Sequence, residues 1–183
     1  MRFAAYAGKN DRRFPHWLPI DDTTVLVIPS DMKPTNRILF LCTGNYYRSR
    51  YAEELFNHAA RNAGLAWNAF SRGLAESSSP ENVGPMSRFA LDALRAKNIL
   101  PEGTTRYPQC CTLADFDTAR LVIALKEAEH RPLLEQRFPE MATRVRFWHV
   151  DDIEQAHPTD ALAKIDDYID DLILTLREPT ARR

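Results

Sequence analysis

A cysteine and an arginine six residues apart lie in the segment 38–56, which reads ILFLCTGNYYRSRYAEELF. A cysteine thiolate is a strong nucleophile, and an arginine guanidinium can bind two oxygens of a phosphate group through parallel hydrogen bonds. Cys42 and Arg48 could therefore attack a phosphate ester and hold its oxygens. The spacing alone is weak evidence, because arginine is common in this chain, so the surrounding residues have to support it.

The segment places the cysteine between a predicted strand and a predicted helix. Residues 38–41 are a short apolar run, which is typical of a strand buried on both faces of a parallel sheet. Apolar residues recur at helical spacing over 52–63, which predicts a helix that begins near Arg48 and is capped by Gly64. In such folds ligands bind beyond the carboxyl ends of the strands, and Cys42 lies at that end.

The loop between these two elements has the composition of an anion-binding cradle. Backbone N–H groups of residues 43–47 can converge on one point, next to the positive N-terminus of the helix. Gly44 and Asn45 tolerate the left-handed backbone conformations that a tight loop of this kind needs. The glycine patterns of the Walker loop and of dinucleotide-binding sites are absent, so a different type of phosphate site is predicted.

The same environment favours the charged thiolate form of a cysteine over the neutral thiol. Arg48 can make a bidentate contact from the first helical turn, and Ser49 can donate a hydrogen bond to the sulfur of Cys42. Thiolate attack on phosphorus, with the oxygens held by amides and one guanidinium, is covalent phosphoryl transfer. The alternative interpretation is a buried structural thiol, with Arg48 on the surface of its helix.

The rest of the chain alternates between strand and helix patterns. Strands are predicted at 67–71, 121–125 and 145–150, and helices at 86–94, 126–138 and 162–176. Strands separated by helices imply a parallel sheet with helices on both sides. We therefore predict an α/β fold, a three-layer sandwich in which a four-stranded parallel sheet is flanked by helices, with an N-terminal extension.

Three regions are predicted along the 183 residues. Residues 1–36 contain four prolines, a basic stretch and one strand-like run at 24–28, which indicates an N-terminal arm or an added edge strand. Residues 37–178 are expected to form one folded domain, and residues 179–183 a tail.

The composition narrows the classes of function. A formal net charge of −1 gives no general reason to expect a nucleic-acid or membrane partner. Three cysteines do not make a disulfide framework and indicate a reducing cytoplasm. The five histidines show no zinc-binding spacing with the cysteines, so neither a metal nor another cofactor is expected.

The segment CTGNYYRS, at residues 42–49, resembles the C-x-G-N-x-x-R-S loop of the low-molecular-weight protein tyrosine phosphatases. The similarity continues through AEELF, FSRGL and VGPMSRFALDAL to the last helix, over about residues 37–177. The resemblance implies that residues 37–178 are a cysteine-dependent phosphatase domain of this family.

The resemblance also implies roles for individual residues. Cys42 would be the nucleophile, Arg48 the phosphate-binding cation and Ser49 the partner of the thiolate. Asn45 would organise the loop, with Ser71 as its support. The expected phosphate-binding residues are Thr43, Gly44, Asn45, Tyr46, Tyr47, Arg48 and Ser49.

Cleavage of a phosphate monoester also needs an acid that protonates the departing oxygen. The family places an Asp-Pro pair after its fourth strand, whereas this chain reads FWHVDDIEQAHP at residues 147–158. Alignment on Trp148 makes Asp152 the general acid and Asp151 the reserve. Alternatively, both aspartates only cap the segment that follows.

Several residues near the loop depart from the family pattern. Tyr47 stands where many members have a second loop cysteine, so a disulfide with Cys42 within the loop is excluded. Tyr46 and Tyr51 could stack on a substrate ring, crowd the pocket or pack against the N-terminal arm. Arg72 could extend a basic rim around the site.

We therefore predict a cytoplasmic phosphomonoester hydrolase that acts on phosphotyrosine in proteins or on a small aryl phosphate and releases inorganic phosphate. One alternative is a thiol-dependent arsenate reductase, which shares this fold and loop and would need Cys110 or Cys111, or an external thiol, to resolve its adduct. Another alternative is a phosphate-binding module that lacks a working acid.

Overall fold

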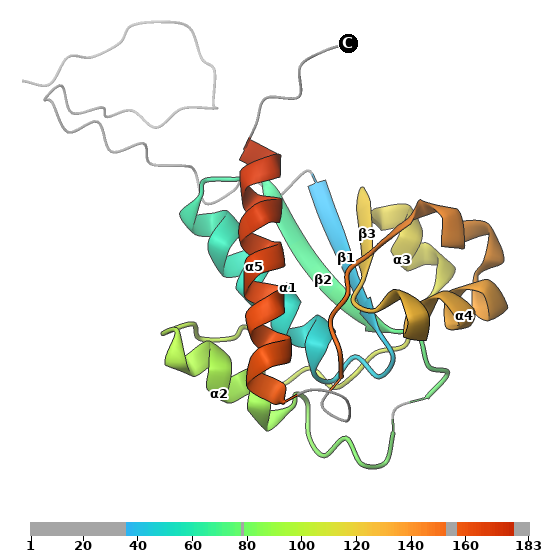
Figure 1. Cartoon of the computed structure of the whole chain (residues 1–183), viewed down its shortest axis with the longest axis horizontal. Coiled ribbons are helices and arrows are strands. Elements are labelled where there is room, and N and C mark those ends of the chain that lie inside the picture. Colours follow the sequence, from blue (N-terminus) through green and yellow to red (C-terminus); the bar gives the residue numbers. More distant parts are fainter. Residues whose placement is uncertain (1–35, 78, 153–156, 178–183) are drawn as a thin grey trace, which may run out of the picture. The chain divides into compact units, whose positions relative to one another are not determined.

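The computed structural model describes residues 36–77, 79–152 and 157–177, and the predicted α/β architecture is confirmed there. Four parallel strands form one sheet in the order β2-β1-β3-β4 (Figure 1). The strands are β1 (Asn36–Cys42), β2 (Trp67–Gly73), β3 (Leu121–Ala124) and β4 (Val145–Phe147). The helices are α1 (Arg48–Asn62), α2 (Arg88–Ala96), α3 (Leu113–Thr118), α4 (Glu127–Arg137), the 3-10 helix η1 (Pro139–Arg144) and α5 (Pro158–Arg177).

Side chains of β1 alternate between the two faces of the sheet. Ile38 and Phe40 pack with residues of α1, α2 and α5. Leu39 and Leu41 pack with residues of α3, α4 and η1. All four side chains are fully buried, which explains the uninterrupted apolar run, and helices cover both faces of the sheet (Figure 1).

The register brings the carboxyl ends of the central strands to one edge of the sheet. Cys42 pairs with Gly73 of β2, and Leu41 pairs with Ala124 of β3. The loop that follows β1 and the segment that follows β3 therefore lie at the same edge. The helix after this loop begins at Arg48, as predicted, so the thiol and the guanidinium are held by two rigid elements.

The observed elements differ from the expected ones at their ends, as in α5, which begins at Pro158 and not at residue 162, and in the short elements. The strand expected at 145–150 ends at Phe147, because the chain beyond it pairs only through an isolated antiparallel bridge between Lys126 and His149. Helices α3 and η1 were not predicted, since six residues are too few to show a helical period. The run expected at 24–28, residues 1–35 of the expected arm and the expected tail lie outside the described residues.

None of the helices in the described ranges is long and apolar enough to cross a membrane. In the same part of the chain, no three His, Cys, Asp or Glu side chains are grouped as ligands of a metal ion would be.

Candidate active site

The loop between β1 and α1 is anchored by hydrogen bonds from more distant segments. The carbonyls of Cys42 and Thr43 accept hydrogen bonds from the backbone of residues 74–75, at 2.8 and 2.9 Å. The carbonyl of Tyr46 accepts a hydrogen bond of 3.0 Å from the N–H of Ser87. The loop carbonyls at these positions are therefore committed to contacts outside the loop.

This anchoring determines where the loop amides point. In a trans peptide the N–H lies opposite the carbonyl, so an outward carbonyl turns the next N–H inward. The rule applies to the N–H groups of Thr43, Gly44 and Tyr47. Asn45, with φ of 51° in the left-handed region, donates its N–H to Cys42 Sγ at 3.2 Å. The geometry thus places the N–H of Asn45 on the sulfur and turns the other three N–H groups towards the interior of the loop.

The sulfur of Cys42 has a second polar neighbour in the first turn of α1. Ser49 Oγ lies 2.9 Å from Cys42 Sγ and can donate its hydrogen to it. Cys42 is buried, with 3% of its surface exposed, and faces the N-terminus of α1. The amide of Asn45, the hydroxyl of Ser49 and the helix N-terminus can all stabilise a negative charge on the sulfur.

The side chain of Asn45 ties the loop to β2 and to the segment before α3. Its Nδ2 donates hydrogen bonds to Ser71 Oγ at 2.7 Å and to Ser49 Oγ at 3.1 Å. Its Oδ1 accepts a hydrogen bond of 3.0 Å from the N–H of Gln109. The structure therefore brings together Asn45, Ser49 and Ser71, the three support residues expected from the sequence.

Two charged residues that sequence reasoning missed extend this network. Ser71 Oγ donates to Glu53 Oε2, and Arg106 donates to both Glu53 Oε2 and Asn45 Oδ1. Glu53 follows Ser49 by one helical turn on α1, so its helical spacing was an available signal. Arg106 belongs to an irregular segment, where no sequence pattern marks it.

Gly73, the last residue of β2, lies directly beneath the loop. An added Cβ there would be 2.9 Å from the carbonyl oxygen of Thr43 and 3.2 Å from the amide nitrogen of Asn45. We expect Gly73→Ala to lower the free energy of unfolding by about 1–3 kcal/mol, because backbone atoms must move. It should also weaken phosphate binding, since the displaced atoms carry the amides. Thermal unfolding with and without inorganic phosphate measures both effects.

Val145→Ala is the control for this substitution. Val145 begins β4, at the opposite edge of the sheet, and its truncation should cost about 1–3 kcal/mol without moving the loop. The rise in Tm that phosphate induces in the Val145→Ala protein should equal that of the unmodified chain. An equal phosphate response in Gly73→Ala would show that the loop does not depend on the glycine.

Arg48 is only 1% exposed and lies between two carboxylates. Its Nη1 donates to Glu129 Oε2 at 2.8 Å and to the carbonyl of Val150 at 3.2 Å. Its Nη2 donates to Glu129 Oε1 at 2.8 Å and to Asp152 Oδ2. Burial lowers the pKa of Arg48, but the hydrogen bond to Glu129 and the nearby negative charges raise it above its ordinary value, so the guanidinium stays charged.

Glu129, in the first turn of α4, was not expected at this site. Its Oε1 also accepts a hydrogen bond from the hydroxyl of Thr43. Burial raises the pKa of Glu129, but the contact with His130 and the hydrogen bonds from Arg48 outweigh that effect and hold the pKa well below its ordinary value. Glu129 is therefore an ionised carboxylate at neutral pH. Its only sequence signal is its position after β3, at the edge of the sheet where the cysteine loop lies.

His130 supports this carboxylate from within the core. Its Nδ1 accepts a hydrogen bond of 3.0 Å from the N–H of Lys126, so the ring proton lies on Nε2. That nitrogen is 3.3 Å from Glu129 Oε1. Burial lowers the pKa of His130, so the fully buried ring is neutral, and its Nε2 lies near the carboxylate without forming a hydrogen bond.

The two candidate acids face different partners. Asp152 contacts Arg48, and a third of its side chain is exposed, so it lies beside the loop and can reach solvent. Asp151 instead bonds to Lys126 and lies 3.7 Å from Lys164 Nζ. The hydrogen bond from Lys126 lowers the pKa of Asp151 below its ordinary value. Of the pair, Asp152 is the one that contacts Arg48.

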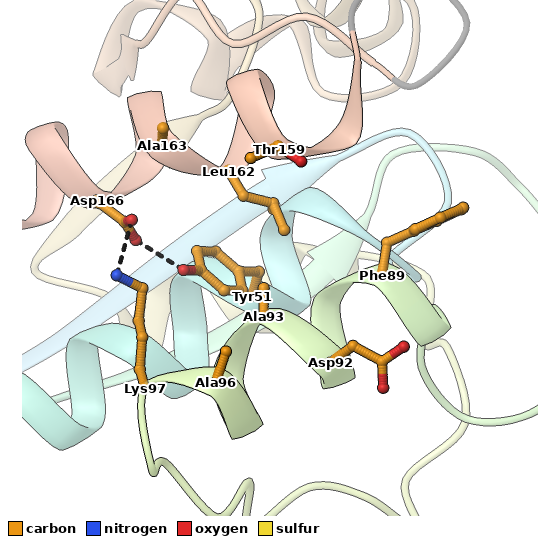
Figure 2. Close-up of a pocket in the computed structure, with 10 residues that line it drawn as sticks. All are labelled: Tyr51, Phe89, Asp92, Ala93, Ala96, Lys97, Thr159, Leu162, Ala163 and Asp166. Atoms are coloured by element: carbon orange, nitrogen blue, oxygen red, sulfur yellow. Dashed lines mark hydrogen bonds and ion pairs between the residues drawn. The ribbon is translucent and has the colours of Figure 1, made fainter.

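The interpretation of Tyr51 as aromatic surface at the mouth of the site is wrong. Tyr51 is fully buried, and its hydroxyl donates to Asp166 of α5 at 2.7 Å (Figure 2). Lys97 pairs with the same carboxylate at 2.9 Å. Tyr51 packs against residues of α2 and α5 and has no exposed surface, so it cannot reach a substrate ring.

The loop tyrosines occupy two further positions. Tyr47 is 6% exposed and belongs to the core cluster beneath α1, α2 and α5. Tyr46 is half-buried, and its hydroxyl donates to the carbonyl of Val83 at 2.7 Å. Tyr46 is therefore the loop aromatic that can meet a ligand, while its hydroxyl holds the segment before α2.

Arg72 and the two adjacent cysteines, Cys110 and Cys111, are not part of the phosphate loop. Arg72 Nε lies 3.0 Å from Asp115 Oδ1, so the expected contribution of Arg72 to a basic rim is not observed. Gly73 pairs with Cys42 on one side and with Cys110 on the other. Two strand spacings separate the Cα atoms of these cysteines by about 10 Å, beyond the reach of a disulfide. Burial raises the pKa of Cys111 to about 12.

A family model described as low molecular weight phosphotyrosine protein phosphatase matches residues 37–178. A comparison with curated proteins finds no match.

Several solved structures have the same fold. A low molecular weight protein tyrosine phosphatase from T. tengcongensis is 26% identical, with a TM-score of 0.63, covering 76% of this chain and 99% of that chain. A cysteine-to-serine mutant of the YwlE arginine phosphatase of Bacillus subtilis, with its active-site serine phosphorylated, is 24% identical, with a TM-score of 0.65. The match covers 79% of this chain and 97% of that chain. Vibrio vulnificus Wzb in complex with benzylphosphonate is 17% identical, with a TM-score of 0.63. The match covers 77% of this chain and 99% of that chain.

Proposed function

Because this chain belongs to the low molecular weight phosphotyrosine protein phosphatase family and is a cysteine-dependent phosphatase, we propose that it hydrolyses phosphotyrosine in proteins or a small aryl phosphate. The reaction proceeds through a phosphocysteine on Cys42. The observation that carries the proposal is the loop geometry, in which Asn45 N–H and Ser49 Oγ approach the sulfur while Arg48 begins the adjoining helix.

In the first step the thiolate of Cys42 attacks phosphorus, and the bond from phosphorus to the ester oxygen breaks. The loop amides and Arg48 hold the three phosphoryl oxygens, where negative charge is spread in the transition state. Asp152 gives its proton to the departing oxygen, which leaves as an alcohol or phenol. Ser49 stabilises the sulfur before the attack.

In the second step water attacks the phosphocysteine and the bond between sulfur and phosphorus breaks. Asp152, now a carboxylate, accepts a proton from the water. Inorganic phosphate leaves, and the thiolate is restored with help from the hydroxyl of Ser49. Both steps require Asp152 to reach the loop and solvent, and its contact with Arg48 and its partial exposure support this role.

Arsenate reduction fits this chain less well. That reaction needs a second thiol to resolve the adduct on Cys42. Cys110 lies about 10 Å from Cys42 between Cα atoms, beyond the reach of a disulfide. Burial raises the pKa of Cys111 to about 12, which opposes formation of its thiolate. An external thiol would have to supply this function.

A substrate panel tests the proposal. The purified full chain is assayed for phosphate release from an aryl phosphate, a phosphotyrosine peptide and phosphoarginine, and for thiol consumption with arsenate. We expect the first two to be hydrolysed fastest. A preference for phosphoarginine would assign it the activity named for YwlE. Thiol consumption with arsenate, or binding of phosphate with no turnover of any substrate, would overturn the proposal.

The cytoplasmic location expected from the cysteine content is part of the same proposal.

A further inference from the structure

The guanidinium of Arg48 is already occupied by protein groups. The two terminal nitrogens of an arginine carry four N–H bonds. In this structure they meet four acceptors, namely both oxygens of Glu129, the carbonyl of Val150 and Asp152 Oδ2. A phosphoryl oxygen can therefore bind these nitrogens only after one of the acceptors leaves.

Glu129 is the acceptor that a phosphoryl group would replace. Its two oxygens span both terminal nitrogens at 2.8 Å, in the two-pronged arrangement that a phosphate group would also use. The hydroxyl of Thr43, a residue of the predicted phosphate loop, donates to the same carboxylate. The carbonyl of Val150 belongs to buried main chain and cannot move away in this manner.

Charge makes the competition direct. Glu129 and Asp152 place two negative charges on one guanidinium, beside a cysteine that reacts as a thiolate. A phosphate dianion that enters while both carboxylates stay in place meets repulsion on every side of Arg48. Glu129 is 29% exposed, so rotation of its side chain can carry the carboxylate into water.

We propose that Glu129 competes with the phosphoryl group of the substrate for Arg48 and thereby sets the affinity of the site for phosphate. This inference rests on the proposed function, because it concerns the same site. Displacement of Glu129 weakens the binding of substrate and transition state alike, so it raises KM and leaves kcat unchanged. It also weakens the hold on inorganic phosphate, the product.

The decisive measurement is inorganic phosphate binding by calorimetry to the full chain carrying Cys42→Ser, with and without Glu129→Gln. Removal of one charge-assisted competitor should tighten phosphate binding about tenfold. In the chain that retains Cys42, Glu129→Gln should lower KM for an aryl phosphate about tenfold with kcat within about twofold of the original value.

Glu127→Gln is the matched control, because it removes the same charge from the same helical turn. Glu127 pairs with Arg131 and not with Arg48. The phosphate affinity and the KM of the Glu127→Gln protein should equal those of the unmodified chain. If Glu127→Gln tightened phosphate binding as much as Glu129→Gln, a general field effect would explain the result and the proposal would be overturned.

Unchanged or weaker phosphate binding in a folded Glu129→Gln protein would also overturn the proposal, since Glu129 would then only position Arg48. If Glu129→Gln fails to fold, Glu129→Asp replaces it, because a side chain shorter by one carbon cannot span both nitrogens as well. Glu129→Asp should then tighten phosphate binding, and a loss of affinity would again overturn the proposal. Absence of turnover by the unmodified chain would refute the proposed function alone, since the binding comparison uses no substrate.

Discussion

Cys42→Ser is expected to reduce turnover of an aryl phosphate by about 10,000-fold or more, because a serine hydroxyl is not ionised at neutral pH and is a much weaker nucleophile. The loop amides, Asn45 and Arg48 do not depend on the sulfur for their anchoring. Phosphate should therefore still bind and raise Tm in this variant. Phosphate release and thermal unfolding, measured on the same preparation, separate lost chemistry from a lost site.

Cys110→Ser makes the same chemical change elsewhere and serves as the control. Cys110 Sγ donates to the carbonyl of Glu76 and has no role in the proposed reaction. Its activity should stay within about twofold of the original. Retention of more than about a hundredth of the activity by Cys42→Ser would remove the phosphocysteine from the mechanism.

Asp152→Asn is expected to lower kcat by about 100-fold or more, because the amide cannot donate the proton that the departing oxygen requires. The loss should be largest for esters of weakly acidic alcohols and smaller for a nitrophenyl ester, whose oxygen leaves without protonation. Single-turnover kinetics with both kinds of ester can resolve this difference. A loss that is equal for both would indicate that Asp152 only positions Arg48.

Asp151→Asn is the matched control for this prediction. The hydrogen bond from Lys126 holds the pKa of Asp151 below its ordinary value, which opposes the protonation that a general acid requires. Asp151 faces Lys126 and Lys164 instead of the loop. The kcat of the Asp151→Asn protein should fall by no more than a few fold. A larger loss for Asp151→Asn than for Asp152→Asn would reverse the assignment.

The parts of the site that could be predicted are those that follow one another along the chain. Cys42, Asn45, Arg48 and Ser49 lie in one strand–loop–helix unit, and their types and spacing imply the chemistry directly. The four-stranded parallel sheet was also predictable, because its strands are apolar runs separated by helical stripes.

The parts that were missed come from distant segments or from packing. Glu129 and Arg106 reach the loop from 81 and 61 residues away along the chain, and no local pattern marks a contact of that range. Stacking of Tyr51 on a substrate ring was one of three possibilities left open, because the face of α1 that meets α5 depends on tertiary packing. The short helices α3 and η1 contain too few residues to show a period.

The anchoring of the loop carbonyls by residues 74–75 and Ser87 has a consequence for how the protein acquires activity. These anchors lie some 30 to 40 residues further along the chain, and contacts of such separation form late when a polypeptide folds. A folding intermediate with β1 and α1 in place would possess the thiol and the guanidinium but not the inward-facing amides. Recovery of catalysis after dilution from denaturant should therefore lag behind recovery of helical circular dichroism.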